Sequence, residues 1–197
     1  MPDNAPSQPA LTGYATLLCV TGGIAAYKAA MLASALVQDG CGVTVAMTRN
    51  ARRFVGPITF EALTGRAVLT NMWRGSHPGR IEHLACSETA DLIVVAPATA
   101  NILAKLATGI GDDLVSTLLL GADSPVILAP AMNSRMWQHP ATKRSITQLQ
   151  ADGHLFVGPD EGRQACRTVG TGRMSEPEKI LAAIRAQLLS KPAKARK

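Results

Sequence analysis

Aromatic residues and long apolar runs are scarce in this chain of 197 residues. Phe, Trp and Tyr make up 4% of the sequence, while apolar residues together make up 47%. Small apolar residues supply the difference, which favours helices packed closely on a parallel sheet. No apolar run reaches the roughly 18 residues that a membrane span needs, and the first residues lack the basic start and apolar block of a secretory signal. We therefore expect a cytoplasmic protein without a membrane partner.

Cysteine spacings that would mark a metal site or a disulfide framework are missing. The four cysteines are widely separated and include no CxxC pair: Cys19, Cys41, Cys86 and Cys166. We therefore expect neither a metal site nor structural disulfides. Cys19 lies in an apolar run and is expected in the core. Cys166 stands among polar and glycine residues, where packing does not explain a thiol.

The net charge of +6 does not come from a nucleic-acid-binding pattern. Four positive charges lie in the last residues, 190–197, which we expect to form a basic flexible tail: Lys191, Lys194, Arg196 and Lys197. The rest of the chain is nearly balanced in charge and has no RNP, zinc-finger or basic-helix pattern. We therefore expect no nucleic-acid partner. Residues 1–13 are also expected to be flexible.

Apolar runs of strand length alternate with helical segments. The runs cover residues 15–20, 43–47, 92–96, 126–129 and 155–157. Helices are predicted at 25–38, 58–63, 101–107, 114–120, 142–151 and 178–189, and a long loop at 66–80. Alternating strands and helices form βαβ units with right-handed crossovers. The predicted fold class is α/β, a single Rossmann-like (flavodoxin-like) domain over residues 14–189 with a mostly parallel sheet and helices on both faces.

The first predicted strand is followed by a glycine turn, TGGIAA at residues 21–26. Ligands of parallel sheets bind beyond the carboxyl ends of the strands, and Gly22 and Gly23 would let the backbone approach a phosphate at a helix N-terminus. The turn is not GxGxxG, and Thr48, not an acidic residue, follows the second strand. The pattern argues against NAD and favours a mononucleotide such as FMN. A tight turn without a ligand stays an open alternative.

Three later loops also follow predicted strands. The loop at 96–101 carries Thr99 and Asn101, which either contact a ligand or cap the next helix. The loop PAMNSRMW at 130–137 presents Asn133, whose amide can donate to a carboxylate, beside apolar Met and Trp side chains. The loop at 158–174 has four glycines around Cys166 and is predicted to be a lid. His83, before the third strand, is a candidate catalytic residue, although a single histidine is more often structural.

Taken together, these loops resemble those of the flavin-dependent cysteine decarboxylases. The resemblance covers residues 15–178, and its most specific parts are the PxMNxxMW pattern at 130–137 and the segment around Ala165-Cys166. It implies that FMN is the cofactor and is contacted by Gly22, Gly23, Ile24, Thr48, Thr99, Ala100, Asn101 and Ala131. It also implies that Asn133, Arg163 and Met136 bind the substrate, with Asn133 on its carboxylate. His83 and Cys166 would be catalytic, with Cys166 as the proton donor.

The sequence departs from the family pattern at two places. The family usually has Ile-x-Leu after the active-site histidine, and this chain has Leu84-Ala85-Cys86, which keeps an apolar helix face. The family usually has Gly after the flap cysteine, and this chain has Arg167. A cation beside a thiol lowers its pKa, so this second departure bears on the proton-donor role of Cys166.

The resemblance is strongest to the branch that decarboxylates 4′-phosphopantothenoylcysteine to 4′-phosphopantetheine in coenzyme A biosynthesis. It implies a homotrimer, or an assembly of trimers, with sites at subunit boundaries. It also implies that the preceding phosphopantothenate–cysteine ligase is a separate protein, unless the chain is part of a bifunctional one. Alternatives of the same fold are a peptide cysteine decarboxylase, a flavin prenyltransferase, a flavin-binding electron carrier and a non-catalytic flavin-binding regulatory protein.

Overall fold

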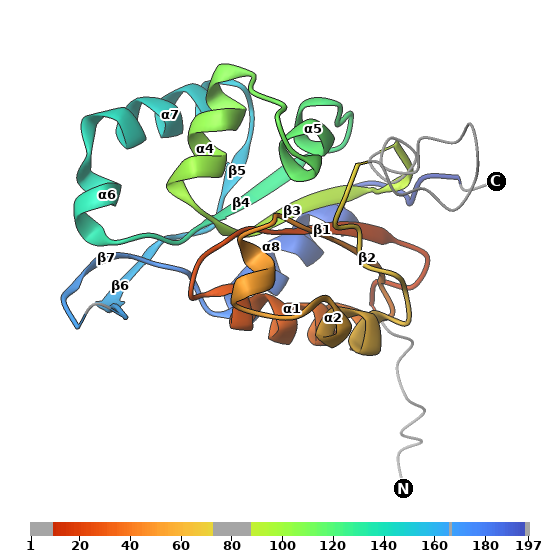
Figure 1. Cartoon of the computed structure of the whole chain (residues 1–197). Coiled ribbons are helices and arrows are strands. Elements are labelled where there is room, and N and C mark those ends of the chain that lie inside the picture. The colour runs from red at the N-terminus through yellow and green to blue at the C-terminus, as the bar shows by residue number, and fades with distance from the viewer. Residues whose placement is uncertain (1–9, 73–87, 166, 196–197) are drawn as a thin grey trace, which may run out of the picture.

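A computed structural model describes residues 10–72, 88–165 and 167–195 of the chain (Figure 1). Five parallel strands form one sheet in the order β2-β1-β3-β4-β5. Their bounds are β1 Ala15–Val20, β2 Gly42–Met47, β3 Leu92–Ala98, β4 Val126–Pro130 and β5 Leu155–Phe156. This is the flavodoxin-like strand order. The strands are all parallel, and the order in which the chain adds them to the sheet changes side between β1 and β3. The predicted fold class is therefore confirmed.

Helices cover both faces of the sheet (Figure 1). On one face lie α1 (Ala26–Gln38), α2 (Pro57–Thr64) and α8 (Pro177–Leu189). On the other lie α4 (Ala100–Thr108), α5 (Leu114–Leu120) and α7 (Pro140–Ala151). Two further helical elements are the short α6 (Ser134–Gln138) and the 3-10 turn η1 (Ala51–Arg53). Within those residues, no helix combines the length and apolar character that a membrane crossing demands.

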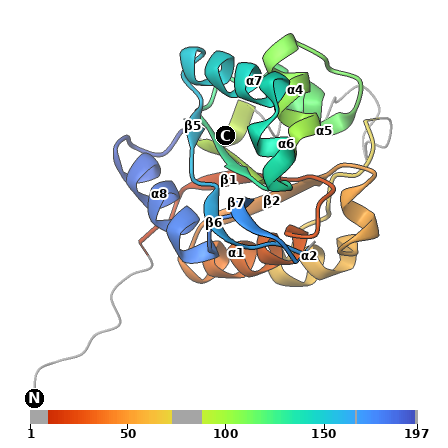
Figure 2. The ribbon, with the colours of Figure 1, turned by 90° about the vertical axis from the view of Figure 1, so that its left-hand side faces the viewer.

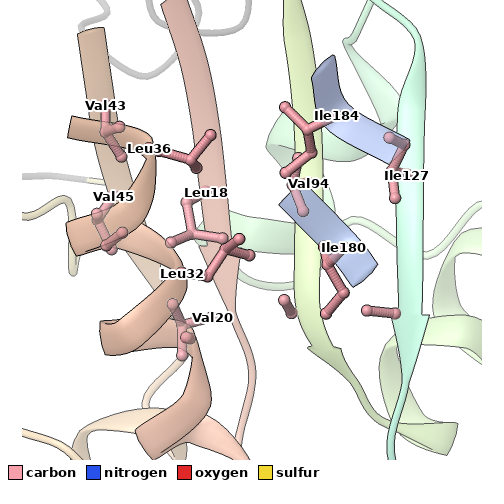
Figure 3. Close-up of a cluster of buried hydrophobic side chains, with 14 of the residues drawn as sticks. Leu18, Val20, Leu32, Leu36, Val43, Val45, Val94, Ile127, Ile180 and Ile184 are labelled. Atoms are coloured by element: carbon pink, nitrogen blue, oxygen red, sulfur yellow. The ribbon is translucent and has the colours of Figure 1, made fainter. Parts of the chain in front are cut away.

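The buried side chains of β1 alternate between two cores. Leu18 and Val20 pack into the core under α1 and α8, whereas Leu17 and Cys19 pack into the core under α4 and α5. Figure 3 shows the first core, in which side chains of α1 and α8 face those of the strands: Leu32, Leu36, Ile180 and Ile184 against Leu18, Val20, Val43, Val45, Val94 and Ile127. A strand buried on both faces reads as a continuous apolar run. Cys19 is fully buried, as predicted, and burial raises the pKa of its thiol to about 12.

Two segments differ from the sequence-based expectation. Residues 158–174, predicted as a lid loop, contain an antiparallel hairpin of β6 (Asp160–Arg163) and β7 (Val169–Arg173). The segment after β4, predicted as a loop, contains α6. The strands of the hairpin are short and rich in glycine and charge, and α6 has only five residues. Neither segment has the apolar periodicity from which elements are predicted.

The start of the C-terminal tail makes specific contacts with the domain. The backbone N–H of Lys194 donates to Asp91 Oδ1 (2.6 Å), and Lys194 Nζ donates to Ser124 Oγ (2.8 Å). The hydroxyl of Tyr14 donates to the carbonyl of Lys191 (2.8 Å). Two residues of the predicted tail, Lys191 and Lys194, therefore contact the domain.

Candidate functional site

A cavity of about 1050 Å³ opens at the carboxyl ends of β1 and β3, where the strand order reverses. Figure 2 views the molecule from this end, with α6 and the β6–β7 hairpin in view. This is the place where ligands of open parallel sheets bind, and the volume is that of a cofactor site. The lining comes from the glycine turn, the segments after β2, β3 and β4, and the hairpin.

The glycine turn leaves the N-terminus of α1 available to an anion. No side chain caps α1 at Ala25, and its first turn has no acidic residue. By contrast, side chains of Thr99, Asp113 and Asn133 accept hydrogen bonds at the N-termini of α4, α5 and α6. The N–H groups of Ala26 and Lys28 donate to the carbonyls of Gly23 and Ala25 (3.0 Å each), so the turn offers a phosphate the positive end of the helix dipole without a competing side chain.

The two glycines of the turn have different surroundings. A Cβ on Gly22 would lie 2.4 Å from Asn50 Cβ, so close packing of the protein itself requires a glycine there. A Cβ on Gly23 would meet only Thr99 Cγ2 at 3.6 Å and Pro97 Cγ at 3.8 Å, which are ordinary contacts. Protein packing therefore does not explain Gly23, whereas close approach of a ligand to the cavity would.

Thr21 ties the glycine turn to the segment after β3. Its buried hydroxyl donates to the carbonyl of Pro97 (2.6 Å) and accepts from the backbone N–H of Thr99 (3.3 Å). The hydroxyl of Thr99 in turn accepts from Ile102 N at the start of α4 (3.4 Å). Thr99 thus caps its helix, which is one of the two interpretations of its sequence position, and it also lines the cavity; its contact with a ligand stays a prediction.

Thr48 and Asn133 hold the next two segments in place. Thr48 Oγ1 accepts from the backbone N–H of Ala51 (3.2 Å), which closes the turn after β2. Asn133 is the N-cap of α6, and its Oδ1 accepts from Arg135 N (2.8 Å). Because Oδ1 serves as the cap, the amide NH₂ is the part of this side chain suited to a substrate carboxylate.

The β6–β7 hairpin forms another part of the cavity wall. Arg163, Gln164 and Arg167 from it line the cavity. Arg167 has φ 67°, the left-handed conformation that favours glycine. The one position where the chain has Arg in place of the family's usual Gly is therefore held in a glycine-like backbone conformation.

Charged residues that sequence reasoning did not single out also line the cavity. Lys28 is buried, and its Nζ donates to the carbonyl of Met174 (3.0 Å) and pairs with Glu176. Lys105 Nζ pairs with Asp113 Oδ2 (2.8 Å). Burial raises the pKa of Asp113, but hydrogen bonds from Lys105 and Ser116 outweigh burial and leave that pKa lowered. Their partners are far along the chain or in loops, so no local signal marks these residues.

The structure brings most of the predicted site residues around this one cavity. All the predicted residues that it describes line the cavity: Gly22, Gly23, Ile24, Thr48, Thr99, Ala100, Asn101, Ala131, Asn133, Met136 and Arg163. The two predicted catalytic residues, His83 and Cys166, lie outside the described residues. Their roles stay predictions, as do the individual ligand contacts.

The strand order and the uncapped helix at its reversal point define a flavodoxin-like nucleotide-binding class of protein. The chain belongs to the Flavoprotein family, whose model matches residues 5–189. It is 53% identical over 165 residues to the coenzyme A biosynthesis bifunctional protein CoaBC of Bacillus subtilis, covering 84% of this chain and 41% of that protein. It is 40% identical over 171 residues to CoaBC of Escherichia coli K12, covering 87% and 42%. The chain thus spans about two fifths of these relatives.

Solved structures share the fold over nearly the whole chain. An FMN-dependent cysteine decarboxylase, SpaF, has a TM-score of 0.76 at 32% identity, with 90% of this chain and 96% of that one covered. A mutant PPC decarboxylase complexed with pantothenoylaminoethenethiol has a TM-score of 0.78 at 27% identity, covering 88% and 97%. The FMN-binding protein AtHal3 has a TM-score of 0.79 at 28% identity, covering 91% and 99%.

Proposed function

We propose that this protein is an FMN-dependent decarboxylase of 4′-phosphopantothenoylcysteine that yields 4′-phosphopantetheine and CO₂ in coenzyme A biosynthesis. The observation that carries the proposal is one cavity that is lined by the glycine turn at the start of α1, by Asn133 and by the hairpin. The names of the CoaBC proteins and of the PPC decarboxylase structure support this substrate. The FMN named for SpaF and AtHal3 supports the cofactor.

The residues present fit FMN. The uncapped first turn of α1 suits its phosphate, and Gly23 leaves room for that phosphate because no protein atom fills the space of a Cβ. Thr48, Thr99, Ala100, Asn101 and Ala131 line the same cavity from the neighbouring strand ends. When bound, FMN supplies a two-electron sink that takes a hydride from the carbon bearing sulfur and returns it after CO₂ has left.

Asn133 has the role of orienting the substrate carboxylate. The cap of α6 holds the side chain of Asn133 in one orientation. Its amide is uncharged, so it can donate a hydrogen bond to a carboxylate without forming a salt bridge. A salt bridge would stabilise the carboxylate in the ground state and oppose loss of CO₂. Arg163 and Met136, which line the cavity, are proposed to contact the rest of the substrate.

His83 and Cys166 are proposed to move protons at the two ends of the reaction. A histidine is suited to accept the proton of the substrate thiol, because its pKa lies near neutral pH. Loss of CO₂ from the thioaldehyde leaves an enethiolate, and Cys166 would donate the proton that completes its reduction to the thiol.

The test is a product analysis with purified protein and FMN. Wild type is expected to be yellow and to release CO₂ and 4′-phosphopantetheine from 4′-phosphopantothenoylcysteine. Cys166→Ser is expected to release CO₂ but to accumulate the oxidised enethiol product, as detected by mass spectrometry. A protein that cannot be loaded with FMN would refute the proposal. A normal yield of 4′-phosphopantetheine from Cys166→Ser would remove Cys166 from the mechanism.

A peptide cysteine decarboxylase is the second candidate, since the similarity at 32% identity to SpaF, an FMN-dependent cysteine decarboxylase, supports cysteine decarboxylation without fixing the molecule that carries the cysteine. Such an enzyme would act on a peptide that ends in cysteine and stop at the enethiol. The same product analysis with a peptide of this kind separates the two functions. Decarboxylation of the peptide in preference to 4′-phosphopantothenoylcysteine would establish the second candidate.

We also propose that the protein forms a homotrimer or an assembly of trimers in the cytoplasm, and that the cysteine ligase of the pathway is a partner activity. Exposed apolar side chains at and after the glycine turn support contact between subunits: Ile24, Tyr27 and Met31 are 61%, 54% and 53% exposed. Ile24 and Tyr27 also line the cavity, so a subunit contact there would place the site at a boundary. Light scattering after size exclusion would measure the mass, and a monomer would refute the assembly.

A further inference from the structure

The side chain of Gln164 bridges the hairpin and the segment that carries Asn133. Its Oε1 accepts a hydrogen bond from the backbone N–H of Ser134 (3.1 Å). Its Nε2 donates to the carbonyls of Gly170 and Thr171 (3.4 and 3.3 Å) on the opposite strand of the hairpin. One amide group therefore contacts β7 and the start of α6 together.

The contact with Ser134 completes the N-terminus of α6. Asn133 Oδ1 serves the N–H of Arg135, and Gln164 Oε1 serves the N–H of Ser134. A helix of five residues has few bonds of its own, so its position depends on such caps. Gln164 thus supplies, from a separate element, the second acceptor that holds Asn133 and its helix.

Two glycines of β7 let the hairpin lie directly on this segment. Met132 N donates to the carbonyl of Gly172 (2.9 Å), and a Cβ on Gly172 would lie 2.4 Å from Met132 O. A Cβ on Gly170 would lie 3.1 Å from Ser134 Cβ. The approach of the two backbones leaves Gln164 at a fixed position beside Ser134.

We propose that Gln164 is a positioning residue, which fixes the hairpin against residues 132–134 and thereby sets the place of Asn133 in the cavity. Its kinetic consequence rests on the proposed function, in which Asn133 orients the substrate carboxylate. The structural part stands without that function. The oxygen of the amide accepts from Ser134 and its nitrogen donates to β7, so a carboxylate would keep the contact with Ser134 alone and an aliphatic side chain would keep neither.

Hydrogen exchange measured by mass spectrometry tests the structural part. In Gln164→Ala, we expect amide exchange in a peptide covering residues 132–138 to become at least about tenfold faster, because Ser134 N–H loses its acceptor. In Gln164→Glu, which keeps an acceptor but loses the donor, exchange at 132–138 should stay within about threefold of wild type while exchange at 168–173 rises. The matched control is Gln148→Ala on α7, whose side chain bonds Asp152 away from the cavity, and it should change neither peptide.

Kinetics with FMN-loaded protein test the functional part. Misplacement of a substrate ligand costs up to about 100-fold in kcat/KM, and we expect Gln164→Ala to lose about tenfold or more, mainly through KM. Gln164 also lines the cavity, but its side chain bonds Ser134 and β7, so FMN affinity, measured by fluorescence quenching, should fall by a smaller factor than kcat/KM. Gln164→Glu should recover most of the loss in KM.

The outcomes separate the two proposals. Wild-type exchange at 132–138 in Gln164→Ala overturns the positioning role whatever the activity, as does a KM in Gln164→Glu no better than in Gln164→Ala. An inactive wild type overturns the proposed function and leaves the exchange result to decide the positioning role. If Gln164→Ala does not fold, Gln164→Glu decides alone, and faster exchange at 132–138 in that variant overturns the proposal.

Discussion

Lys28 Nζ on α1 lies 3.0 Å from Oε2 of Glu176, a residue that follows the β6–β7 hairpin in the chain. The lysine is buried and the glutamate is half exposed. The pair therefore links the helix that follows the glycine turn to the end of the hairpin wall. Lys28 Nζ also donates to the carbonyl of Met174, so the ammonium has two acceptors on the segment that closes the hairpin.

The Lys28–Glu176 pair predicts a pH dependence of stability. Hydrogen bonding to Lys28, together with the charge of the neighbouring Arg173, holds the pKa of Glu176 below its ordinary value of 4.5. A carboxyl whose pKa is lowered by folding stabilises the protein above its unfolded-state pKa, and this contribution is lost as pH falls through the folded-state pKa. Glu176→Gln should lower the free energy of unfolding by about 1 kcal/mol or less at neutral pH, since the carboxylate is half exposed and screened.

Urea unfolding at several pH values measures the effect of Glu176→Gln. The difference from wild type should shrink as pH falls from about 6 to about 3. Asp113 and Asp160 also have lowered pKa values, but wild type and Glu176→Gln both contain these residues, so their contribution cancels in the difference. Glu161→Gln, an exposed change on β6, is the control. A difference that is independent of pH would contradict the ion pair.

Substitution of Gly22 and of Gly23 by alanine should have different effects, the first on stability and the second on FMN binding. Gly22→Ala places a Cβ 2.4 Å from Asn50 and should cost about 1–3 kcal/mol of stability. Gly23→Ala makes only ordinary contacts and should stay within about 0.5 kcal/mol of wild type. If FMN approaches this turn, Gly23→Ala should nevertheless weaken FMN binding by about tenfold or more, measured by fluorescence titration. Unchanged affinity in Gly23→Ala would place the phosphate elsewhere.

Thr21→Val should loosen the two strand ends that flank the cavity. The substitution keeps the shape but removes the donor to the carbonyl of Pro97, which costs about 1–3 kcal/mol for a buried group. FMN affinity should fall as well, because the glycine turn and Thr99 lose their link. The control is Thr16→Val at the other end of β1, where the buried hydroxyl contacts Cys41 Sγ. Thr16→Val should leave FMN affinity at the wild-type value, and an equal loss in both variants would refute a local effect.

Gly172→Ala should detach the hairpin from the segment after β4. Its φ of 141° strains any side chain, and its Cβ would lie 2.4 Å from Met132 O. We expect a loss of about 2–4 kcal/mol in local stability, seen as faster proteolysis within residues 160–173 and lower kcat/KM. Gly153→Ala has a similarly unfavourable φ of 86° but no close contact, and should cost about 1 kcal/mol without a change in kcat/KM. If Gly172→Ala is cleaved within residues 160–173 at the same rate as wild type, this account of the hairpin is contradicted.

Local sequence patterns predicted the sheet and most helices, because each buried strand is a continuous apolar run between polar turns. The run at 15–20 became β1, and the helix predicted at 25–38 became α1 with one residue fewer at its start. The hairpin and α6 were missed for the opposite reason. They are short and polar, and they are stabilised by contacts such as Met132 with Gly172 that join residues far apart in the chain.

The sequence by itself determined the α/β class and the candidate loops, since apolar periodicity and glycine turns are local properties of the chain. The tertiary structure decided which of these loops meet. The strand order brings Thr21 to Pro97, and the hairpin brings Gln164 to Ser134. It also decided that α1 begins without a capping side chain at the cavity, where Thr99 and Asn133 cap α4 and α6. Strand order and helix position depend on packing between distant segments, which no local pattern encodes.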